Sequence, residues 1–242
     1  MSRVYLVRHG QAGTRQAYDS LSDLGRRQAR LLGEYFISEG MQFAAAFSGT
    51  LTRQEQTAAE VKAAYQDAGA AFPEIVPDCG WNEFDLTDVY RALAPQMCAE
   101  DAEFRREYEE MARHARAAAE RPDAEVNRRW MPCDTKIVEA WVEGRYPYHG
   151  ESWQGFLERV AGCRARLGHG DRNENIVVFT SATPIGVWTA LALEICDKRV
   201  LRLAGVLHNT SCTVIRLHHD HLRLDSFNSV PHLGKPEMRT HR

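Results

Sequence analysis

The chain of 242 residues lacks the features expected of a secreted, nucleic-acid-binding or membrane protein. Its six cysteines are scattered, with no CxxC pair, which argues against a disulfide scaffold and indicates reduced thiols. The chain has 30 basic and 33 acidic residues and therefore a net charge of −3. No excess of positive charge indicates binding to nucleic acid or to an anionic membrane. The first apolar run is short and is broken by Arg8 and His9, so no signal peptide is expected. We therefore expect a cytoplasmic protein with no nucleic-acid or membrane partner.

Long hydrophobic runs are also scarce. The longest uncharged stretch runs from Asn175 to Leu193, which is long enough for a membrane span. The segment Thr180-Ser181-Ala182-Thr183-Pro184 interrupts it and predicts a strand, a turn and a helix instead. Hydrophobic residues make up 44% of the chain and charged residues 26%, which are values typical of a globular domain.

Short apolar runs alternate with segments of helical periodicity through most of the chain. Such alternation predicts an α/β fold, here three α/β/α layers around a mostly parallel central sheet. The expected strands are 4–7, 43–47, 75–76 and 176–179, followed by a hairpin of 212–217 and 222–227. The expected helices are 22–40, 51–68, 153–167 and 184–195.

The segment from about 88 to 148 differs in character, since it contains a run rich in Glu, Arg and Ala over 100–120 and a second helical stretch over 126–143. It is too long for a loop and too polar for a central strand. We expect one domain over residues 1–234, with 88–148 as a helical insertion over the active site and 235–242 as a loose C-terminal tail.

Side chains suited to phosphate chemistry follow several of the expected strands. Arg8 and His9 end the first strand, Arg53 follows the second, and Glu83 follows the third. Because parallel strands place their carboxyl ends at one edge of a sheet, these groups can converge there. Two guanidinium groups can bind a phosphoryl group, an imidazole can attack it, and a carboxyl group can protonate the leaving oxygen. Arg53 has a simpler alternative role, an ion pair on its own helix.

Several motifs together resemble the histidine phosphatase superfamily, the phosphoglycerate mutase-like proteins. They occur in family order and are Val7-Arg8-His9-Gly10-Gln11, Leu21-Ser22 with Leu24-Gly25 and Gln28-Ala29, Ser48 with Leu51 and Arg53, Gln56-Thr57-Ala58, Asn82-Glu83-Phe84, Gly150-Glu151-Ser152-Trp153 with Phe156 and Arg159-Val160, and Asn209-Thr210-Ser211.

The resemblance implies a phosphoglycerate mutase-like fold and a phosphatase that acts through a phosphohistidine. His9 would be the nucleophile, Arg8 and Arg53 would bind the phosphoryl group, and Glu83 would donate the proton. No metal or cofactor is required by that mechanism. Gly10 and Gln11, which follow the nucleophile, are candidate substrate-binding residues.

One position departs from the family pattern. Ser181 stands where the resemblance implies a second histidine, so a neutral hydroxyl replaces an imidazole. Losing one preorganised donor to a transition state costs about 10²–10³ in rate. Three alternatives follow: a slow enzyme, an enzyme in which His149 or His208 substitutes, or a pseudophosphatase that binds phosphoesters with little turnover. Ser181 and His149 are therefore candidate substrate-binding residues.

The substrate expected is a small phosphorylated molecule. Mutase activity is disfavoured because Gln11-Ala12-Gly13-Thr14 stands where the glycolytic relatives have other residues. A homodimer is compatible with the sequence, which does not specify an oligomeric state. The histidines at 218, 219 and 221 suggest a metal, but alternation along a strand separates their side chains, so a solvated hairpin tip is the better interpretation.

Overall fold

The computed structural model describes residues 1–121, 123–167, 173–218 and 221–242. These residues form two compact units. Unit 1 contains Met1–Gly13, Tyr18–Glu83 and Val160–Arg242, and unit 2 contains Thr14–Ala17 and Phe84–Arg159. Unit 2 thus resembles the segment that the sequence sets apart, but it extends further at both ends and takes in part of the loop after His9.

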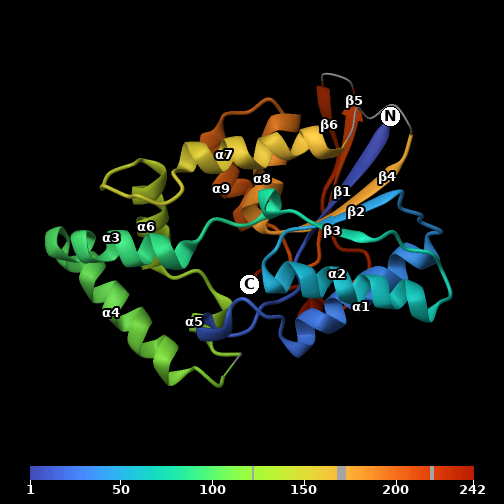
Figure 1. Ribbon diagram of the computed structural model, residues 1–242. Helices are drawn as coiled ribbons and strands as arrows, with labels where there is room; N and C mark the ends of the chain where they lie inside the picture. Colours follow the sequence, from blue (N-terminus) through green and yellow to red (C-terminus); the bar gives the residue numbers. More distant parts are fainter. Residues whose placement is uncertain (122, 168–172, 219–220) are drawn as a thin grey trace. The chain divides into compact units, whose positions relative to one another are not determined.

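Unit 1 is built on a six-stranded mixed sheet with the order β3-β2-β4-β1-β5-β6 (Figure 1). The strands are β1 Ser2–Arg8, β2 Ala45–Ser48, β3 Ile75–Pro77, β4 Asn175–Thr180, β5 Cys212–His218 and β6 His221–Ser229. The first four strands in this order run parallel, while β5 and β6 add antiparallel edges. This arrangement confirms the predicted fold class, and β5 with β6 forms the predicted hairpin.

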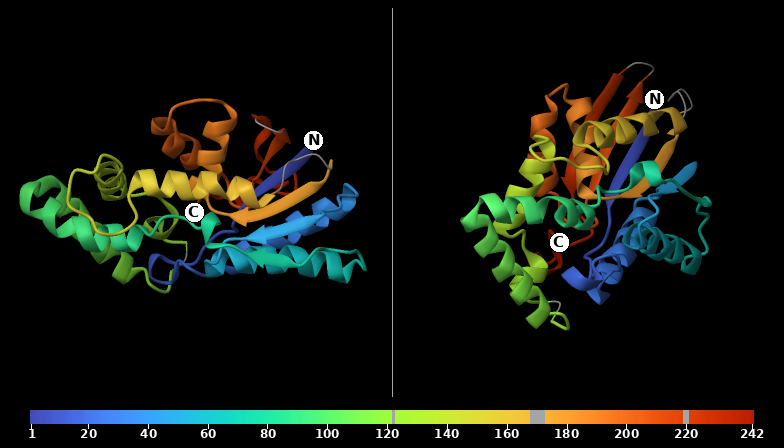
Figure 2. Two further views of the ribbon diagram at one scale, coloured as in Figure 1. Left: turned by 45° about the horizontal axis from the view of Figure 1, so that its top comes forward. Right: turned by 60° about the vertical axis from the view of Figure 1, so that its left-hand side comes forward.

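Helices cover both faces of this sheet. They are α1 Asp23–Ser38, α2 Thr52–Asp67, α8 Ala182–Ala192 and α9 Val200–Gly205, together with the end of α7 Trp153–Gly162. Figures 1 and 2 show α1 and α2 on one face and α8 and α9 on the other. Alternation along β1 and β4 explains the layering, because Val7 and Phe179 pack with Phe36 of α1 and Val61 of α2 while their neighbours face the opposite layer.

The described residues also form short 3-10 helices, at Arg15–Ala17, Cys79–Trp81, Cys163–Leu167, Asp197–Arg199 and Pro236–Met238. The uncharged stretch from Asn175 to Leu193 forms β4 and α8, as its interrupted pattern predicts. Among the helices in the described part of the chain, none has both the length and the apolar character needed to cross a membrane.

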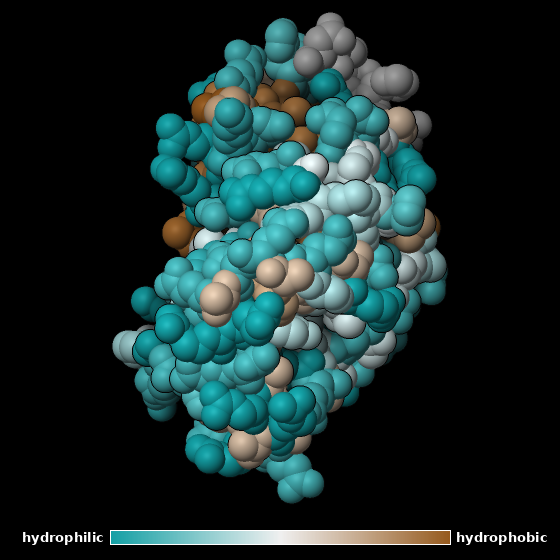
Figure 3. Space-filling view, turned by 90° about the vertical axis from the view of Figure 1, so that its left-hand side faces the viewer, coloured by the Kyte–Doolittle hydropathy of each residue, from teal (hydrophilic) through white to brown (hydrophobic). Residues whose placement is uncertain are grey.

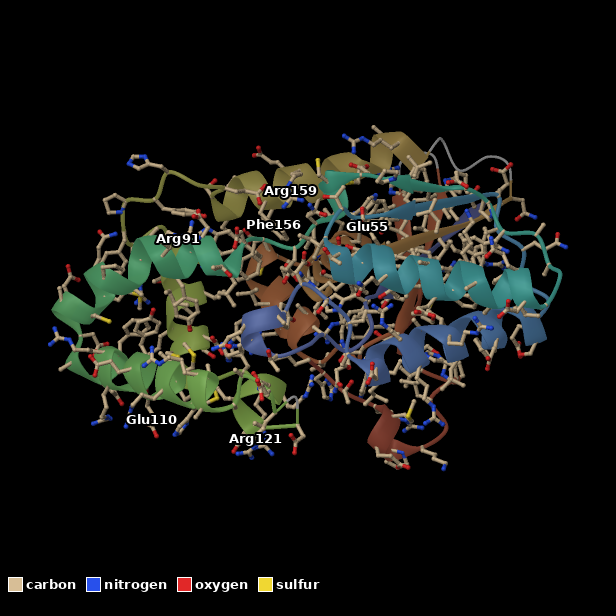
Figure 4. The ribbon with its side chains drawn as sticks, turned by 60° about the horizontal axis from the view of Figure 1, so that its bottom comes forward. Glu55, Arg91, Glu110, Arg121, Phe156 and Arg159 are labelled. Atoms are coloured by element: carbon tan, nitrogen blue, oxygen red, sulfur yellow. The ribbon has the colours of Figure 1, made fainter. Side chains whose placement is uncertain are left out.

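Unit 2 is helical. Its helices are α3 Leu86–Glu100, α4 Ala102–Ala117, α5 Glu125–Arg128 and α6 Pro132–Val142, with the beginning of α7. Phe104 and Met111 are the buried residues of α4, whereas Glu110 is exposed (Figure 4). In the space-filling view of Figure 3, hydrophilic side chains cover most of the visible face.

A largely buried ion pair between Arg15 and Asp134 organises unit 2. Arg15 Nη1 donates to Asp134 Oδ1 at 3.0 Å and its Nη2 contacts Oδ2 of the same carboxylate. The Tyr90 hydroxyl also donates to Asp134 Oδ1, at 2.7 Å, and the Met131 amide donates to Oδ2 at 2.7 Å. Asp134 itself has no exposed surface. The residues 14–17 are therefore fastened to α6 inside unit 2.

The C-terminal segment corrects an expectation, because residues 235–242 are not a loose tail. The side-chain amide of Gln28 donates to Met238 O at 2.7 Å and to Thr240 Oγ1 at 2.9 Å. The amide of Asn209 donates to Thr240 O at 2.7 Å. The polar composition of the segment suggested a solvated end, but its carbonyl groups satisfy buried donors of unit 1.

Candidate active site

The carboxyl ends of β1, β2 and β4 meet at one edge of the sheet. Arg8 pairs with Thr180 in the register of β1 with β4, and Ser48 pairs with Phe179 in that of β2 with β4. The amide of His9 donates to Thr180 O at 2.9 Å, which holds His9 beside the end of β4. The expected convergence of groups from separate strands is therefore supported by the backbone register.

The ring of His9 is buried and held in one orientation. The Nε group of Arg53 donates to His9 Nε2 at 3.3 Å, so Nε2 is the acceptor and Nδ1 carries the proton. Nδ1 then donates to Gly10 O at 2.8 Å. Burial, with the charges of Arg53 and Arg8, lowers the pKa of His9 well below its usual value. His9 is therefore a neutral imidazole at neutral pH, with an unprotonated Nε2 beside a guanidinium group.

Arg8 is also buried, with 6% of its surface exposed. Its two terminal nitrogens donate to backbone carbonyls, Nη1 to Leu207 O and Nη2 to His241 O, the latter at 2.6 Å. Its Nε is buried with no hydrogen-bond partner among the described residues. An unsatisfied buried donor is costly, and such a donor on a guanidinium group suits an anionic ligand.

Arg53 is placed by α2 and by the loop that precedes α1. Its Nη1 donates to Asp19 Oδ1 at 2.8 Å, and its guanidinium carbon lies 5.0 Å from the centre of the Tyr18 ring. The ion pair on its own helix that the sequence allowed would use Glu55 or Glu60, but Glu55 is exposed on α2 (Figure 4) and Glu60 pairs with Arg26. Arg53 therefore combines contact with His9, an acidic partner and an aromatic neighbour.

Glu83 lies at the amino end of α8. Its Oε2 accepts a hydrogen bond from the amide of Thr183 at 3.0 Å. One amide at the amino end of α8 is therefore occupied by the carboxyl group of Glu83. Glu83 also acts on Arg8 electrostatically, raising the pKa of that guanidinium group against the larger, lowering effect of burial.

Ser181 is fully buried next to a buried amide. Its Oγ accepts a hydrogen bond from Gln54 Nε2 at 2.8 Å, and the same nitrogen donates to Trp81 O at 3.2 Å. Gln54, like Ser181, has no exposed surface. The hydroxyl that stands in place of the expected imidazole is therefore engaged by a neighbour from α2.

The loop that follows His9 packs so closely against the backbone of Gly25 that position 10 requires a glycine. A Cβ added at Gly10 would lie 2.4 Å from Gly25 O, and one added at Gly25 would lie 2.1 Å from Gln11 O. Gln11 is buried, and its Oε1 accepts a hydrogen bond from Ser22 Oγ, the cap of α1, at 2.8 Å. Two glycines thus let the loop after His9 pass directly over the first turn of α1.

The two histidines considered as substitutes lie in different units. His149 is exposed in unit 2. His208 is half-buried in unit 1, where its ring lies 4.2 Å from that of His241 and burial lowers its pKa. Of the three histidines assigned to a solvated hairpin tip, His219 lies outside the described residues.

Sequence reasoning missed three residues that are connected to His9 directly or through Arg53 and Tyr18. The Tyr18 ring lies 6.4 Å from the His9 ring, edge to face. Asp19 binds Arg53, and the guanidinium carbon of Arg242 lies 5.2 Å from the centre of the Tyr18 ring. No motif signalled Tyr18 or Asp19 in a polar loop, and Arg242 falls in the segment expected to be loose.

Comparisons with known proteins agree with this arrangement. The family model described as histidine phosphatase superfamily (branch 1) matches residues 4–142 and 134–230. These matches cover most of the chain, which therefore belongs to the histidine phosphatase superfamily. No match was found among curated proteins.

Solved structures share the fold at low sequence identity. A mutant phosphoserine phosphatase from Entamoeba histolytica in complex with phosphoserine is 18% identical, with a TM-score of 0.60 over 96% of this chain and 100% of that one. Bacillus stearothermophilus YhfR is 15% identical, with a TM-score of 0.63 over 96% and 100%. The mycobacterial glucosyl-3-phosphoglycerate phosphatase is 19% identical, with a TM-score of 0.56 over 94% and 98%.

Proposed function

We propose that this protein is a phosphatase that hydrolyses a small phosphomonoester through a phosphohistidine at His9. The observation that carries the proposal is the state of the His9 ring, which is neutral with Nε2 unprotonated beside Arg53. A nucleophile needs a free electron pair, and the neighbouring cation attracts the phosphate that it attacks.

The first step would transfer the phosphoryl group to the protein. Nε2 of His9 attacks phosphorus while the bond from phosphorus to the ester oxygen breaks. Arg53 and the Nε donor of Arg8 bind the phosphoryl oxygens, which carry the charge that spreads in the transition state. A protonated Glu83 gives its proton to the departing alcohol oxygen.

The second step would return the protein to its starting state. Water attacks the phosphohistidine and the bond from Nε2 to phosphorus breaks. Glu83, now a carboxylate, takes the proton of that water, and inorganic phosphate leaves. Nδ1 remains protonated throughout and bound to Gly10 O, so the ring keeps its orientation in both steps.

The substrate class is supported by the relatives and by the charge of the site. The Entamoeba histolytica relative is in complex with phosphoserine, a small phosphomonoester. Arg8 and Arg53, each only 6% exposed, are guanidinium groups that suit a compact, doubly charged anion. The family matches over 4–142 and 134–230 fall in both units, which supports one domain with a helical insertion.

Trapping of the phosphoenzyme tests this proposal. The native protein, mixed with a reactive phosphodonor and quenched in alkali, should carry phosphate on the peptide that contains His9, detected by mass spectrometry. The His9→Ala protein should carry none. A phosphate on another residue, or none on the native protein, would overturn the mechanism.

A pseudophosphatase is the second candidate, favoured by the burial of Ser181 and its engagement by Gln54. Such a protein would bind phosphate and phosphomonoesters without turnover. Calorimetric binding of orthophosphate with no phosphoenzyme and no phosphate release would favour it over the phosphatase.

A further inference from the structure

Arg242 contacts the Tyr18 ring, as Arg53 does, although it lies far from the other residues of the site in sequence. The Tyr18 ring has Arg53, Arg242 and His9 as neighbours. Its centre is 5.0 Å from the guanidinium carbon of Arg53, 5.2 Å from that of Arg242 and 6.4 Å from the His9 ring. An aromatic face attracts a guanidinium group, so Tyr18 can hold Arg242 near the nucleophile.

The backbone around Arg242 is fastened to the end of β1. The carbonyl of His241 accepts from Arg8 Nη2 at 2.6 Å, and the carbonyl of Thr240 accepts from the Asn209 amide at 2.7 Å. The side-chain amide of Asn209 in turn donates to His9 O at 3.1 Å. The residues before Arg242 are therefore held by a direct hydrogen bond from Arg8 to His241 and by Asn209, which bonds to both Thr240 and His9.

Burial makes this arrangement informative. Arg242 is 8% exposed, and Arg8 and Arg53 are each 6% exposed. Arginine side chains are rarely buried to this extent without an anionic or hydrogen-bonding role. Arg53 and Arg242 also repel Arg8, since both lower its pKa in addition to the larger effect of burial. A dianionic ligand would relieve this repulsion.

We propose that Arg242 is a third substrate-binding guanidinium group, which binds the phosphoryl group together with Arg8 and Arg53. It supplies positive charge to a site in which position 181 offers only a neutral hydroxyl engaged by Gln54. This inference rests on the proposed phosphatase function and adds a binding residue to it.

Three variants test the assignment. Arg242→Gln removes the charge and keeps a polar side chain, Arg242→Lys keeps the charge, and Arg239→Gln is the matched control. Arg239 lies in the same segment, is exposed, and donates from its Nε to Leu233 O at 3.0 Å. The measurements are the calorimetric dissociation constant of orthophosphate, and KM and kcat for a phosphomonoester that the native protein hydrolyses.

A charge-assisted hydrogen bond to a buried anion predicts that Arg242→Gln raises both the dissociation constant and KM by about 10- to 100-fold. Arg242→Lys should recover most of that loss, which a role confined to packing would not predict. Arg239→Gln should stay within about twofold of the native protein in both constants.

The outcomes separate this inference from the proposed function. If the native protein hydrolyses the ester in a His9-dependent manner while Arg242→Gln matches Arg239→Gln in both constants, Arg242 does not bind substrate. If Tyr18→Leu, which removes the aromatic neighbour and leaves the charge, also has no effect on KM, the proposed placement of Arg242 is refuted as well. If the native protein neither binds orthophosphate nor releases phosphate, the phosphatase proposal fails first.

Discussion

Replacing Ser181 by histidine should destabilise the protein rather than improve its site. Ser181 has no exposed surface, and its Oγ is 2.8 Å from the Nε2 atom of Gln54. Gln54 is tightly enclosed on its other side, because a Cβ added at Gly49 would lie 2.0 Å from Gln54 Oε1. An imidazole at 181 must therefore displace the Gln54 amide from its bonds.

The magnitude follows from two costs. Inserting extra side-chain volume into a packed interior costs about 1–3 kcal/mol. Gln54 Nε2 donates to Ser181 and to Trp81 O, and each lost hydrogen bond costs about 0.5–1.5 kcal/mol. Ser181→His should therefore lower the free energy of unfolding by about 2–6 kcal/mol.

A double-mutant cycle isolates the contact. Gln54→Ala removes the side chain that fills the space, so Ser181→His should be less harmful in that background, with a coupling of about 0.5–3 kcal/mol. Denaturant unfolding followed by circular dichroism gives each stability. Ser38→His, at an exposed position at the end of α1, should change stability by less than about 0.5 kcal/mol. A Ser181→His protein as stable as the native one would refute the packing described for Gln54.

Further predictions concern charge and protonation. Asp134→Asn breaks the ion pair of the fully buried Asp134 with the largely buried Arg15 and should cost about 3–5 kcal/mol in a denaturant titration; a loss below about 1 kcal/mol would contradict the importance of this pair. Burial lowers the pKa of His232 to about 4, so the unfolded state binds a proton below about pH 6.5 while the folded state does not. Stability should therefore fall between pH 6.5 and 4 by up to about 3 kcal/mol, and His232→Asn should flatten this part of the profile. Burial and the charges of Arg53 and Arg8 lower the pKa of His9, so Arg53→Gln should raise that pKa in an NMR titration. An unchanged pKa would contradict the electrostatic contact between Arg53 and His9.

The sequence predicted most of unit 1 because its signals are local. The β-branched and apolar run over residues 176–179 lies within β4, and Ser22 caps α1 by accepting from the amide of Gly25. Strand register then follows from parallel packing, which brings Arg8 to the level of Thr180. Groups that directly follow a strand end could therefore be predicted as neighbours.

Other contacts depend on long-range packing, which leaves no local signal. Gln54 and Ser181 are separated by 127 positions, and Arg8 and His241 by 233. Residues 235–242 are mostly polar, include Lys and Pro and directly follow a Gly, a composition typical of solvated chain ends. The hydrogen-bond donors that hold this segment belong to Gln28 and Asn209, which are distant in sequence. Only the folded chain shows that these partners meet.

Helix α3 is a further case in which tertiary packing, and not the local sequence, decides the structure. Helix α3 runs from Leu86 to Glu100 with Pro95 inside it, although proline in a helix interior removes a hydrogen bond. Val89, Leu93 and Met97, spaced four residues apart, form its buried face, and tertiary packing of that face outweighs the local cost.

Phosphate release by the native protein and by His9→Ala most directly tests the central claim. An aryl phosphate and a panel of small phosphorylated metabolites are the substrates, and His114→Ala, at an exposed histidine of α4, is the matched control. Loss of the nucleophile should lower kcat/KM at least about 1000-fold, while the control keeps the native value. Equal turnover by His9→Ala and the native protein would contradict the assignment of His9 as the nucleophile.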